Sequence, residues 1–419
     1  MEKQMACLSG EEKHTTNSKP LLGPKFTSAR IEATSKCNLR CSYCFASNTM
    51  RSQKGTDIST PELFRALDMF RRSDIKKLLY SGGEPFARRD FIDVLSASEG
   101  IRTSYVSNGS LVKDSHLEAI ADMPHVNRIR YSIDGFAAHD AVRGGSSWKH
   151  VLGRVQATAT IKRKRKVSVV GQATATFDSL DDVPELMHLL QAAGADRFRM
   201  FILRFSGEIS NGKMALNSDY YDKYLRTVRE IARLCQSGSI TLQTEVDTGY
   251  QSDLERVLSL YEYPAFTDDT HPCQYLLHVL MIRSNGDIAI CPFMQFPVGN
   301  IAEFDEVREI ERHLPLVAWR NFRAVDISSC QNCRYLKVCR GGCRKTAVDT
   351  FGTFQSEDPV YCYLFPKIER EIWPEQPTAV QKHYASLINQ AGSMPNWNRD
   401  KLDEFLESFR SRRAQGLVH

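Results

Sequence analysis

Six short strand-like runs alternate with helical stretches between residues 28 and 238, and this alternation constrains the fold more than any other feature of the sequence. A typical unit is KVSVVGQATAT, a β-rich run, followed by DVPELMHLLQAAG, which has helical periodicity. Alternation of this kind predicts parallel strands covered by helices. Six units suit an open, partial barrel better than a closed eightfold one. We therefore predict an α/β fold whose core, residues 27–238, is a partial (β/α)6 barrel.

The unusual segments of this region fall at the C-terminal ends of the predicted strands, where a TIM-like barrel carries its chemistry. In chain order they are TSKCNLRCSYCF, SGGEP, VSNGS and YSIDG. The basic run at 162–166 instead precedes the fifth strand, at the opposite rim. We interpret it as a solvated helix end, with a docking patch for an acidic partner as the alternative.

The first of these segments holds Cys37, Cys41 and Cys44 with gaps of three and two residues. Structural zinc usually takes four ligands, so three thiolates leave such a site incomplete. Three thiolates can hold three irons of a [4Fe–4S] cluster and leave the fourth iron open to an outside ligand. A zinc site completed by a histidine is the alternative for these three residues taken alone.

The four motifs together resemble those of the radical S-adenosylmethionine (SAM) enzymes, which carry CxxxCxxC after the first strand of a partial barrel. The resemblance implies that the open iron binds SAM and that the reduced cluster cleaves it. The 5′-deoxyadenosyl radical released in this way takes a hydrogen atom from the substrate. The resemblance also implies SAM contacts from Tyr43, Gly82, Gly83, Glu84, Ser107, Asn108, Ser132, Asp134 and Arg143. Phe45, beside the last cysteine, is a further candidate for the adenine.

A second cysteine array lies in the C-terminal third and consists of Cys273, Cys291, Cys330, Cys333, Cys339, Cys343 and Cys362. Its spacing resembles the SPASM extension of radical SAM enzymes, which implies two auxiliary [4Fe–4S] clusters and three clusters in all. By this resemblance Cys273, Cys291 and Cys343 hold one cluster, and the other four cysteines hold the second. No cysteine lies between 273 and 291, so the fourth ligand of the first cluster is a different group or an open iron position. A pair of zinc sites in a binding module is the alternative.

Three residues near these arrays are interpreted without a ligand role. His271 and His278 are predicted to be structural, and Cys235 continues an apolar helical pattern and is predicted to lie in the core. Cys7 belongs to a polar leader, residues 1–26, which we predict to be disordered.

After residue 238 the alternation stops. SITLQTEVD reads as one further strand at the start of a linker, residues 239–270. Residues 271–365 form the predicted SPASM domain, in which VLMIRSNGDIAICP carries an Asn-Gly hairpin signal. Residues 366–419 are predicted to be a helical tail.

Net charge and hydropathy limit the partners and the cellular compartment that this chain can have. The net charge of +5 is too small to argue for a nucleic-acid partner, and no apolar run approaches the eighteen residues of a membrane span. The N-terminus has no secretory signal, so we predict a cytoplasmic protein. In that compartment twelve cysteines point to metal ligation more than to disulfides.

The reaction implied is an oxidative modification at an unactivated C–H bond, with an auxiliary cluster able to accept an electron or ligate the substrate. Sulfatase-maturing relatives carry an aspartate after the cysteine that corresponds to Cys291, where this chain has Pro292 and Phe293. Too few residues precede Cys37 for a leader-binding domain. We therefore predict a precursor peptide as substrate, delivered by a separate leader-binding protein, with a flavodoxin or ferredoxin as electron donor. The alternatives are dehydrogenation of a small polar alcohol, such as a sugar or aminocyclitol, and protein maturation of the sulfatase type.

Overall fold

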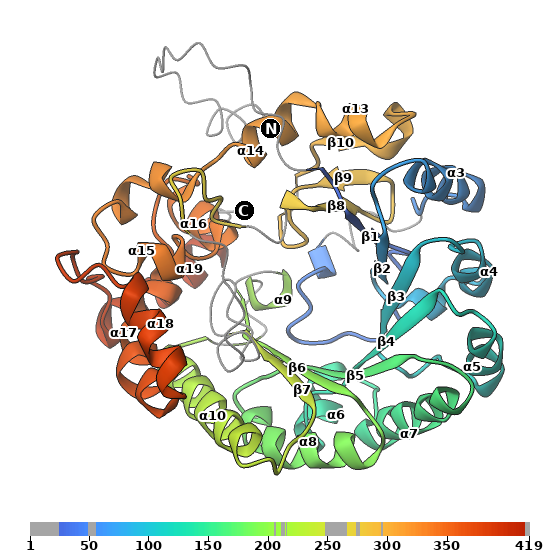
Figure 1. Ribbon diagram of the computed structural model, residues 1–419, viewed down its shortest axis with the longest axis horizontal. Coiled ribbons are helices and arrows are strands. Elements are labelled where there is room, and N and C mark those ends of the chain that lie inside the picture. Colours follow the sequence, from blue (N-terminus) through green and yellow to red (C-terminus); the bar gives the residue numbers. More distant parts are fainter. Residues whose placement is uncertain are drawn as a thin grey trace.

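One curved, mostly parallel sheet organises the molecule. The computed structural model describes residues 25–48, 56–204, 207–210, 214, 216–247, 266–273, 277–294 and 296–414. The strands are β1 (Ser28–Glu32), β2 (Lys77–Ser81), β3 (Arg102–Ser107), β4 (Val126–Ser132), β5 (Ser168–Thr174), β6 (Arg197–Phe201), β7 (Gln243–Val246), β8 (Val279–Ile282), β9 (Asp287–Ala289) and β10 (Gly299–Asn300). Their order is β10-β9-β8-β1-β2-β3-β4-β5-β6-β7, and only the pairs β8/β9 and β9/β10 are antiparallel. Figure 1 shows that this sheet is strongly curved.

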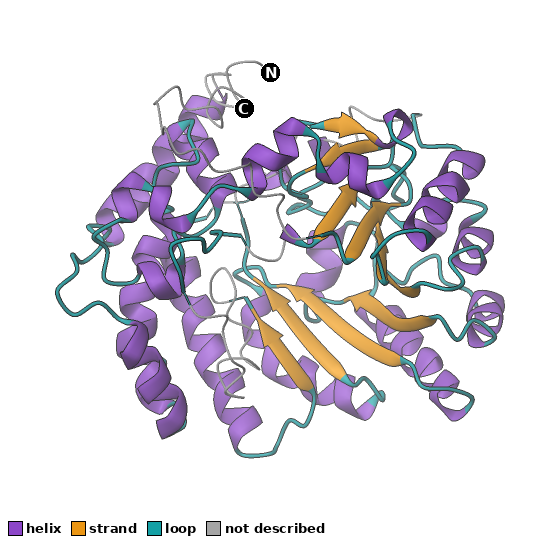
Figure 2. Ribbon diagram, turned by 45° about the horizontal axis from the view of Figure 1, so that its top comes forward, coloured by secondary structure: helices purple, strands orange, loops and turns teal. Residues whose placement is uncertain are grey.

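Helices cover the outer face of the sheet, as Figures 1 and 2 show. They are α3 (Thr60–Arg71), α4 (Phe91–Ser96), α5 (Asp114–Ala121), α6 (Ala137–Arg143), α7 (Trp148–Ala159), α8 (Val183–Ala192) and α10 (Ser218–Gln236), with the short α9 (Gly207–Ser210) on the inner side. Helix α3 illustrates why these segments form helices. Ser59 and Glu62 make a capping box at its start, and Leu63, Leu67 and Phe70 recur on one buried face.

The predicted α/β fold is confirmed, and the run at 239–247 does add a strand, β7, beside β6. The Asn-Gly signal is confirmed as the turn between β8 and β9, where Gly286 has a φ of +88°. The pairing of β8 with β1 in parallel was not predicted. All four residues of β8 are buried, so this short apolar strand is stable only inside a sheet.

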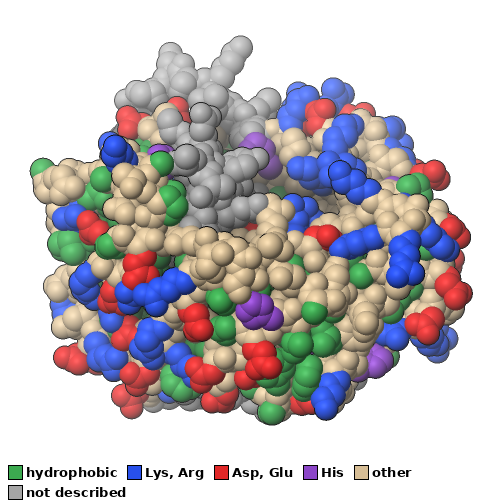
Figure 3. Space-filling model, turned by 60° about the horizontal axis from the view of Figure 1, so that its bottom comes forward, with side chains coloured by type: hydrophobic (Ala, Val, Ile, Leu, Met, Phe, Trp, Pro, Cys, Tyr) green, Lys and Arg blue, Asp and Glu red, His purple; other side chains and the backbone are tan. Residues whose placement is uncertain are grey.

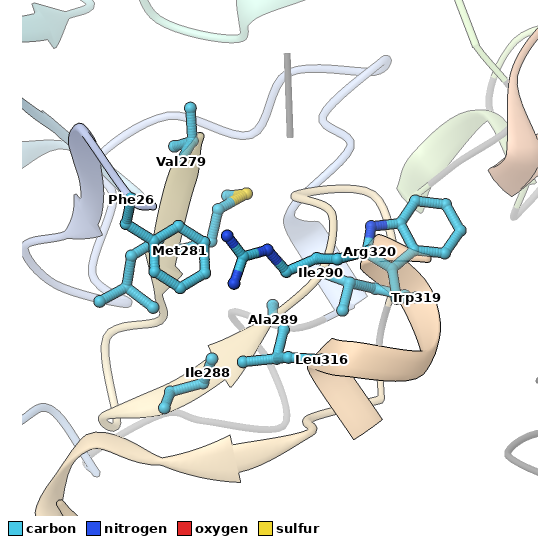
Figure 4. Close-up of a pocket in the computed structure, with 10 residues that line it drawn as sticks. Phe26, Val279, Met281, Ile288, Ala289, Ile290, Leu316, Trp319 and Arg320 are labelled. Atoms are coloured by element: carbon cyan, nitrogen blue, oxygen red, sulfur yellow. The ribbon is translucent and has the colours of Figure 1, made fainter. Parts of the chain in front are cut away.

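Phe26 and residues of β8, β9 and α14 (Leu314–Arg320) line a small pocket of about 10 Å³, shown in Figure 4. Phe26 is 1% exposed there, although the sequence analysis placed it at the end of the leader. The Arg320 guanidinium lies 4.5 Å from the centre of the Phe26 ring. The C-terminal part of the chain is therefore packed against the start of β1.

The remaining helices lie between α10 and the β8–β10 edge in Figure 1. They are α13 (Val307–Glu311), α14 (Leu314–Arg320), α15 (Leu336–Cys339), α16 (Arg344–Phe351), α17 (Pro359–Glu371), α18 (Thr378–Leu387) and α19 (Arg399–Ala414). Helix α19 buries Leu402, Leu406 and Phe409, and both oxygens of Asp403 accept hydrogen bonds from Ser218 at the start of α10. Across the described residues, no helix has both the length and the apolar character needed to cross a membrane.

Candidate active site at the C-terminal ends of the strands

The loop after β1 carries Cys37, Cys41 and Cys44 as three half-buried thiols that act on one another electrostatically. Burial raises the pKa of all three, and the neighbouring Cys41 and Cys37 thiols help to raise that of Cys44 to about 12. Three adjacent thiolates are therefore disfavoured here unless positive charge compensates them. The irons of a cluster would supply that charge, so the donor set fits the predicted group.

Backbone contacts hold the cysteine loop against the SGGEP segment after β2. The Gly83 N–H donates to the Thr34 carbonyl at 2.9 Å, and the Glu84 N–H donates to the Lys36 carbonyl at 2.8 Å. Gly82 has a φ of +126°, and a Cβ at this position would lie 2.5 Å from the Thr34 oxygen. Only glycine fits this close approach, which explains the first glycine of the motif.

Glu84 is 1% exposed and connects two of the predicted SAM-contact segments. Its carboxylate accepts hydrogen bonds from the Ser107 hydroxyl at 2.8 Å and from the Asn108 N–H at 2.7 Å. Burial raises the pKa of Glu84 to about 7, against the opposing effect of these donors. The structure thus joins Glu84, Ser107 and Asn108 in one network at the ends of β2 and β3.

A second buried network lies at the end of β4. Arg143 donates from Nε and Nη2 to both oxygens of Asp134, at 2.7 and 2.9 Å, and the Tyr43 hydroxyl also donates to Asp134. The Arg143 guanidinium lies 5.5 Å from the centre of the Tyr43 ring. Burial acts to raise the pKa of Asp134, but Arg143 beside it holds that pKa below its ordinary value. Asp134 and Arg143, predicted as separate SAM contacts, form one ion pair, with the half-buried Ser132 two residues before it.

Two supporting residues were missed by the sequence analysis. His139 is fully buried; its Nδ1 accepts the Asp134 N–H at 3.1 Å, and its Nε2 lies 3.0 Å from the Ser146 hydroxyl. Asn38, inside the cysteine loop, pairs its side chain with those of Ser110 and Asn108. Neither residue carries a sequence signal beyond its place within a motif, because both act through segments that are distant in the chain.

Aromatic side chains connect the first cysteine loop to the second array. The rings of Phe45 and Phe293 lie 4.9 Å apart, so the residue predicted near the adenine packs beside the Cys291 loop. Arg204 lies 5.7 Å from the Phe293 ring and donates to Asp247 at 2.7 Å. It also donates to the Tyr361 hydroxyl, next to Cys362 in the chain.

The C-terminal cysteines fall into two electrostatic groups. Burial and the neighbouring Cys330 and Cys333 thiols raise the pKa values of Cys339 and Cys362 well above the ordinary range. Burial and Cys343 raise the pKa of Cys291 to about 11. For these six cysteines the grouping is the one that the SPASM resemblance implies, and the place of Cys273 stays a prediction. This grouping leaves the ligand roles as predictions.

The remaining predictions concern two histidines and two cysteines outside the proposed ligand sets. Cys273 is buried, and its N–H donates to Nδ1 of His271, whose Nε2 lies 3.0 Å from the Trp319 carbonyl, so His271 has a structural role. His278 is exposed, with Nδ1 3.4 Å from the Lys25 carbonyl. Cys235 is half-buried and packs against the core, as predicted. Cys7 lies outside the described residues.

The helical tail contributes to the site, which the sequence analysis did not predict. A cavity of about 630 Å³ separates α19 from the thiols of Cys330, Cys333 and Cys362. Its other wall includes Trp397, Phe405 and further residues between 393 and 408.

In the described part of the chain, no three Cys, His, Asp or Glu side chains converge closely enough to hold a single metal ion.

Comparison with known proteins agrees with this geometry. Residues 31–190 match the family model of the radical SAM superfamily. The AdoMet-dependent heme synthase of Nitratidesulfovibrio vulgaris is 26% identical over 79% of this chain and 91% of that protein. The mycofactocin maturase MftC of Mycolicibacterium smegmatis is 26% identical over 81% of this chain and 84% of its own length. The PqqA peptide cyclase of Rhodopseudomonas palustris is 24% identical over 81% and 87%.

Among solved structures, Streptococcus suis SuiB bound to its precursor peptide SuiA superposes with a TM-score of 0.64. The two proteins are 20% identical, and the match covers 80% of this chain and 75% of that one. This likeness shows a shared fold.

Proposed function

This chain is a radical SAM enzyme related to the SPASM-type maturases, and from that premise we propose that it oxidatively modifies a C–H bond of a ribosomally made precursor peptide. The observation that carries this proposal is the placement of three cysteines at the end of β1, facing the Glu84 and Asp134 networks. A PqqA peptide cyclase among the relatives supports a peptide substrate.

We assign roles to the chain's own residues on this basis. Cys37, Cys41 and Cys44 would hold the cluster that binds SAM. When bound, the cluster and SAM supply a 5′-deoxyadenosyl radical that removes a hydrogen atom from the substrate. Glu84 would hold the ammonium group of SAM, because its buried carboxylate is the acidic group that acts electrostatically on Cys37.

The remaining SAM contacts would come from Gly82 and Gly83 through the backbone, from Ser107, Asn108 and Ser132 through polar side chains, and from Tyr43, Asp134 and Arg143. The Arg143 atom left outside its ion pair with Asp134 is Nη1, which is the donor available to a SAM carboxylate. The packed rings of Phe45 and Phe293 would limit access of water from the side of the Cys291 loop.

The second cysteine array would hold two auxiliary [4Fe–4S] clusters, with the ligand sets of the SPASM resemblance. We further propose a cytoplasmic enzyme that receives electrons from a flavodoxin or ferredoxin and its peptide from a separate leader-binding protein.

Anaerobic reconstitution tests the assignment. The wild-type chain should bind about twelve irons and form 5′-deoxyadenosine from SAM with dithionite. Cys41→Ala should lose about four irons and all SAM cleavage, whereas the matched control Cys235→Ala should keep both. Stoichiometric zinc without iron–sulfur absorption would contradict the proposal. So would 5′-deoxyadenosine formation by Cys41→Ala.

A further inference from the structure

The inner face of the curved sheet is rich in arginine. Residues on the outer face of each strand pack under the helices: the Tyr131 hydroxyl lies 2.8 Å from Thr158 of α7, and a Cβ at Gly171 would meet Leu190 of α8. The alternate positions therefore lie on the inner face of the sheet. Five of them are half-buried arginines, Arg30, Arg128, Arg130, Arg197 and Arg199.

The strand register places three of these arginines at the level of Ser132, a predicted SAM contact, or one level below it. Arg130 pairs across β5 with Arg197 through Val170. One level higher, Ser132 pairs through Gln172 with Arg199, which pairs in turn with Glu245. Arg199 thus lies two strand spacings, about 10 Å, from Ser132 on the same level of the sheet.

Few inner positions of the described strands are acidic. In the described strands β1 to β7, the acidic residues at inner positions are Glu32 and Glu245. Glu32 is buried beside Arg283 and Arg30, and burial raises its pKa. Glu245 is shared between Arg197 Nη1, at 3.5 Å, and Arg199 Nε, at 3.2 Å.

The Arg128 guanidinium lies in the same field. Burial and the positive charges of Arg197 and Arg102 lower its pKa, and Glu245 opposes them. Arg128, Arg197 and Arg199 therefore share one carboxylate, that of Glu245, on a partly buried surface. This excess of positive charge is local, because basic and acidic side chains are interspersed over most of the molecular surface that Figure 3 shows.

A ligand that carries carboxylates would balance the positive charge of this surface. Unbalanced charge away from water is unfavourable until a counter-charge arrives, and the planar arginine fork matches a carboxylate in two parallel hydrogen bonds. We propose that the part of the substrate lying against this inner face carries acidic groups, and that it is a segment of the peptide with Asp or Glu next to the modified residue. This inference rests on the proposed function and names the chemistry of its substrate.

Fluorescence anisotropy on the reconstituted enzyme with SAM tests this directly. Three labelled Gly-Ser peptides that differ only in a central pair of Glu, Gln or Lys residues serve as probes. The Glu peptide should bind about tenfold more tightly than the Gln peptide, as one charge-assisted pair predicts. Equal binding of these two peptides, or tighter binding of the Lys peptide, would overturn the proposal.

Arg199→Gln and Arg197→Gln should each reduce the advantage of the Glu peptide to about threefold or less, and Arg199→Lys should restore part of it. Arg226→Gln, on the exposed side of α10, is the matched control and should keep the full advantage. Retention of the full advantage in both Gln variants would count against this face as the binding surface. Iron content and cooperative unfolding of each variant establish that it is folded.

Calorimetric titration with glutarate separates this inference from the proposed function. Binding of glutarate that is lost in Arg199→Gln, together with no binding of any peptide, would overturn the peptide substrate and keep carboxylate recognition. Peptide binding that is independent of charge would have the opposite meaning.

Discussion

Buried charge at the end of β4 is balanced within a few side chains. Asp134 is fully buried and accepts hydrogen bonds from Arg143, from Tyr43 and from the Thr174 N–H at 2.8 Å. His139 accepts the backbone N–H of the same residue. Removing one member therefore leaves another charge or donor without its partner in a place that water does not reach.

The Asp134–Arg143 pair should be costly to break from one side. Asp134→Asn leaves a buried guanidinium without a counter-charge, so we expect the free energy of unfolding to fall by roughly 3–5 kcal/mol. Urea denaturation followed by circular dichroism measures it. The control is Asp181→Asn, whose carboxylate is 74% exposed beside Lys223 and should contribute less than about 1 kcal/mol. Equal losses of unfolding free energy in the two variants would mean that the buried pair stabilises the fold no more than an exposed one does.

His139 should make stability depend on pH. Burial, together with Arg143, lowers the pKa of His139 to about 4, so the unfolded chain binds the proton more readily than the folded one. Its contribution is present above pH 6.5 and is lost as the pH falls toward 4. Between pH 7 and 5.5 the wild-type chain should lose about 1 kcal/mol more stability than His139→Gln. His150→Gln, at an exposed position of α7, should follow the wild type in paired urea titrations. Parallel curves for wild type and His139→Gln would rule out this role.

At the scale of elements, the terminal helix links the barrel to the second cysteine array. One face of α19 is buried against the molecule, Asp403 holds Ser218 of α10, and residues from 393 to 408 form a wall of the 630 Å³ cavity beside Cys330, Cys333 and Cys362. The docking of one helix therefore controls how open these thiols are to solvent.

Loosening α19 should expose the group at Cys330, Cys333 and Cys362. Asp403→Ala removes two hydrogen bonds of 2.6 Å to Ser218 and should weaken docking by roughly 1–3 kcal/mol. We expect about four irons to be lost faster in air, with SAM cleavage by the first cluster preserved. Timed iron assays and 5′-deoxyadenosine yields measure the two effects. Glu407→Ala, on the exposed side of the helix, is the control. The same rate of iron loss in both variants would show that docking of α19 does not protect this site.

At the scale of the whole molecule, local sequence signals predicted most of the barrel strands and the turn between β8 and β9. They did not predict contacts between segments that are distant in the chain. The strands, the Asn-Gly turn and the need for Gly82 each depend on a few neighbouring residues. The pairing of β8 with β1 joins segments on either side of the whole predicted barrel, and periodicity contains no register for such a pair. The Arg143–Asp134 pair was not predicted for a similar reason, because the two residues belong to different motifs and each motif resembles a contact to SAM by itself.

Because β8 extends the same sheet, the N-terminal and C-terminal parts should unfold together. A fragment of residues 1–247 would leave β1 without β8 and would expose the face of α10 that contacts α17 and α19. We expect this fragment to show no cooperative urea transition and no measurable SAM binding. Full-length Cys333→Ser is the control: it should lose one cluster but keep the sheet intact, and so keep a single transition. If the fragment instead unfolded cooperatively, held about four irons and bound SAM, then β8 would be an accessory to a self-sufficient barrel. The parallel register between Ser28–Ile31 and Val279–Ile282 argues for the first outcome. Without β8, β1 pairs only with β2 and becomes an exposed edge strand directly before the cysteine loop.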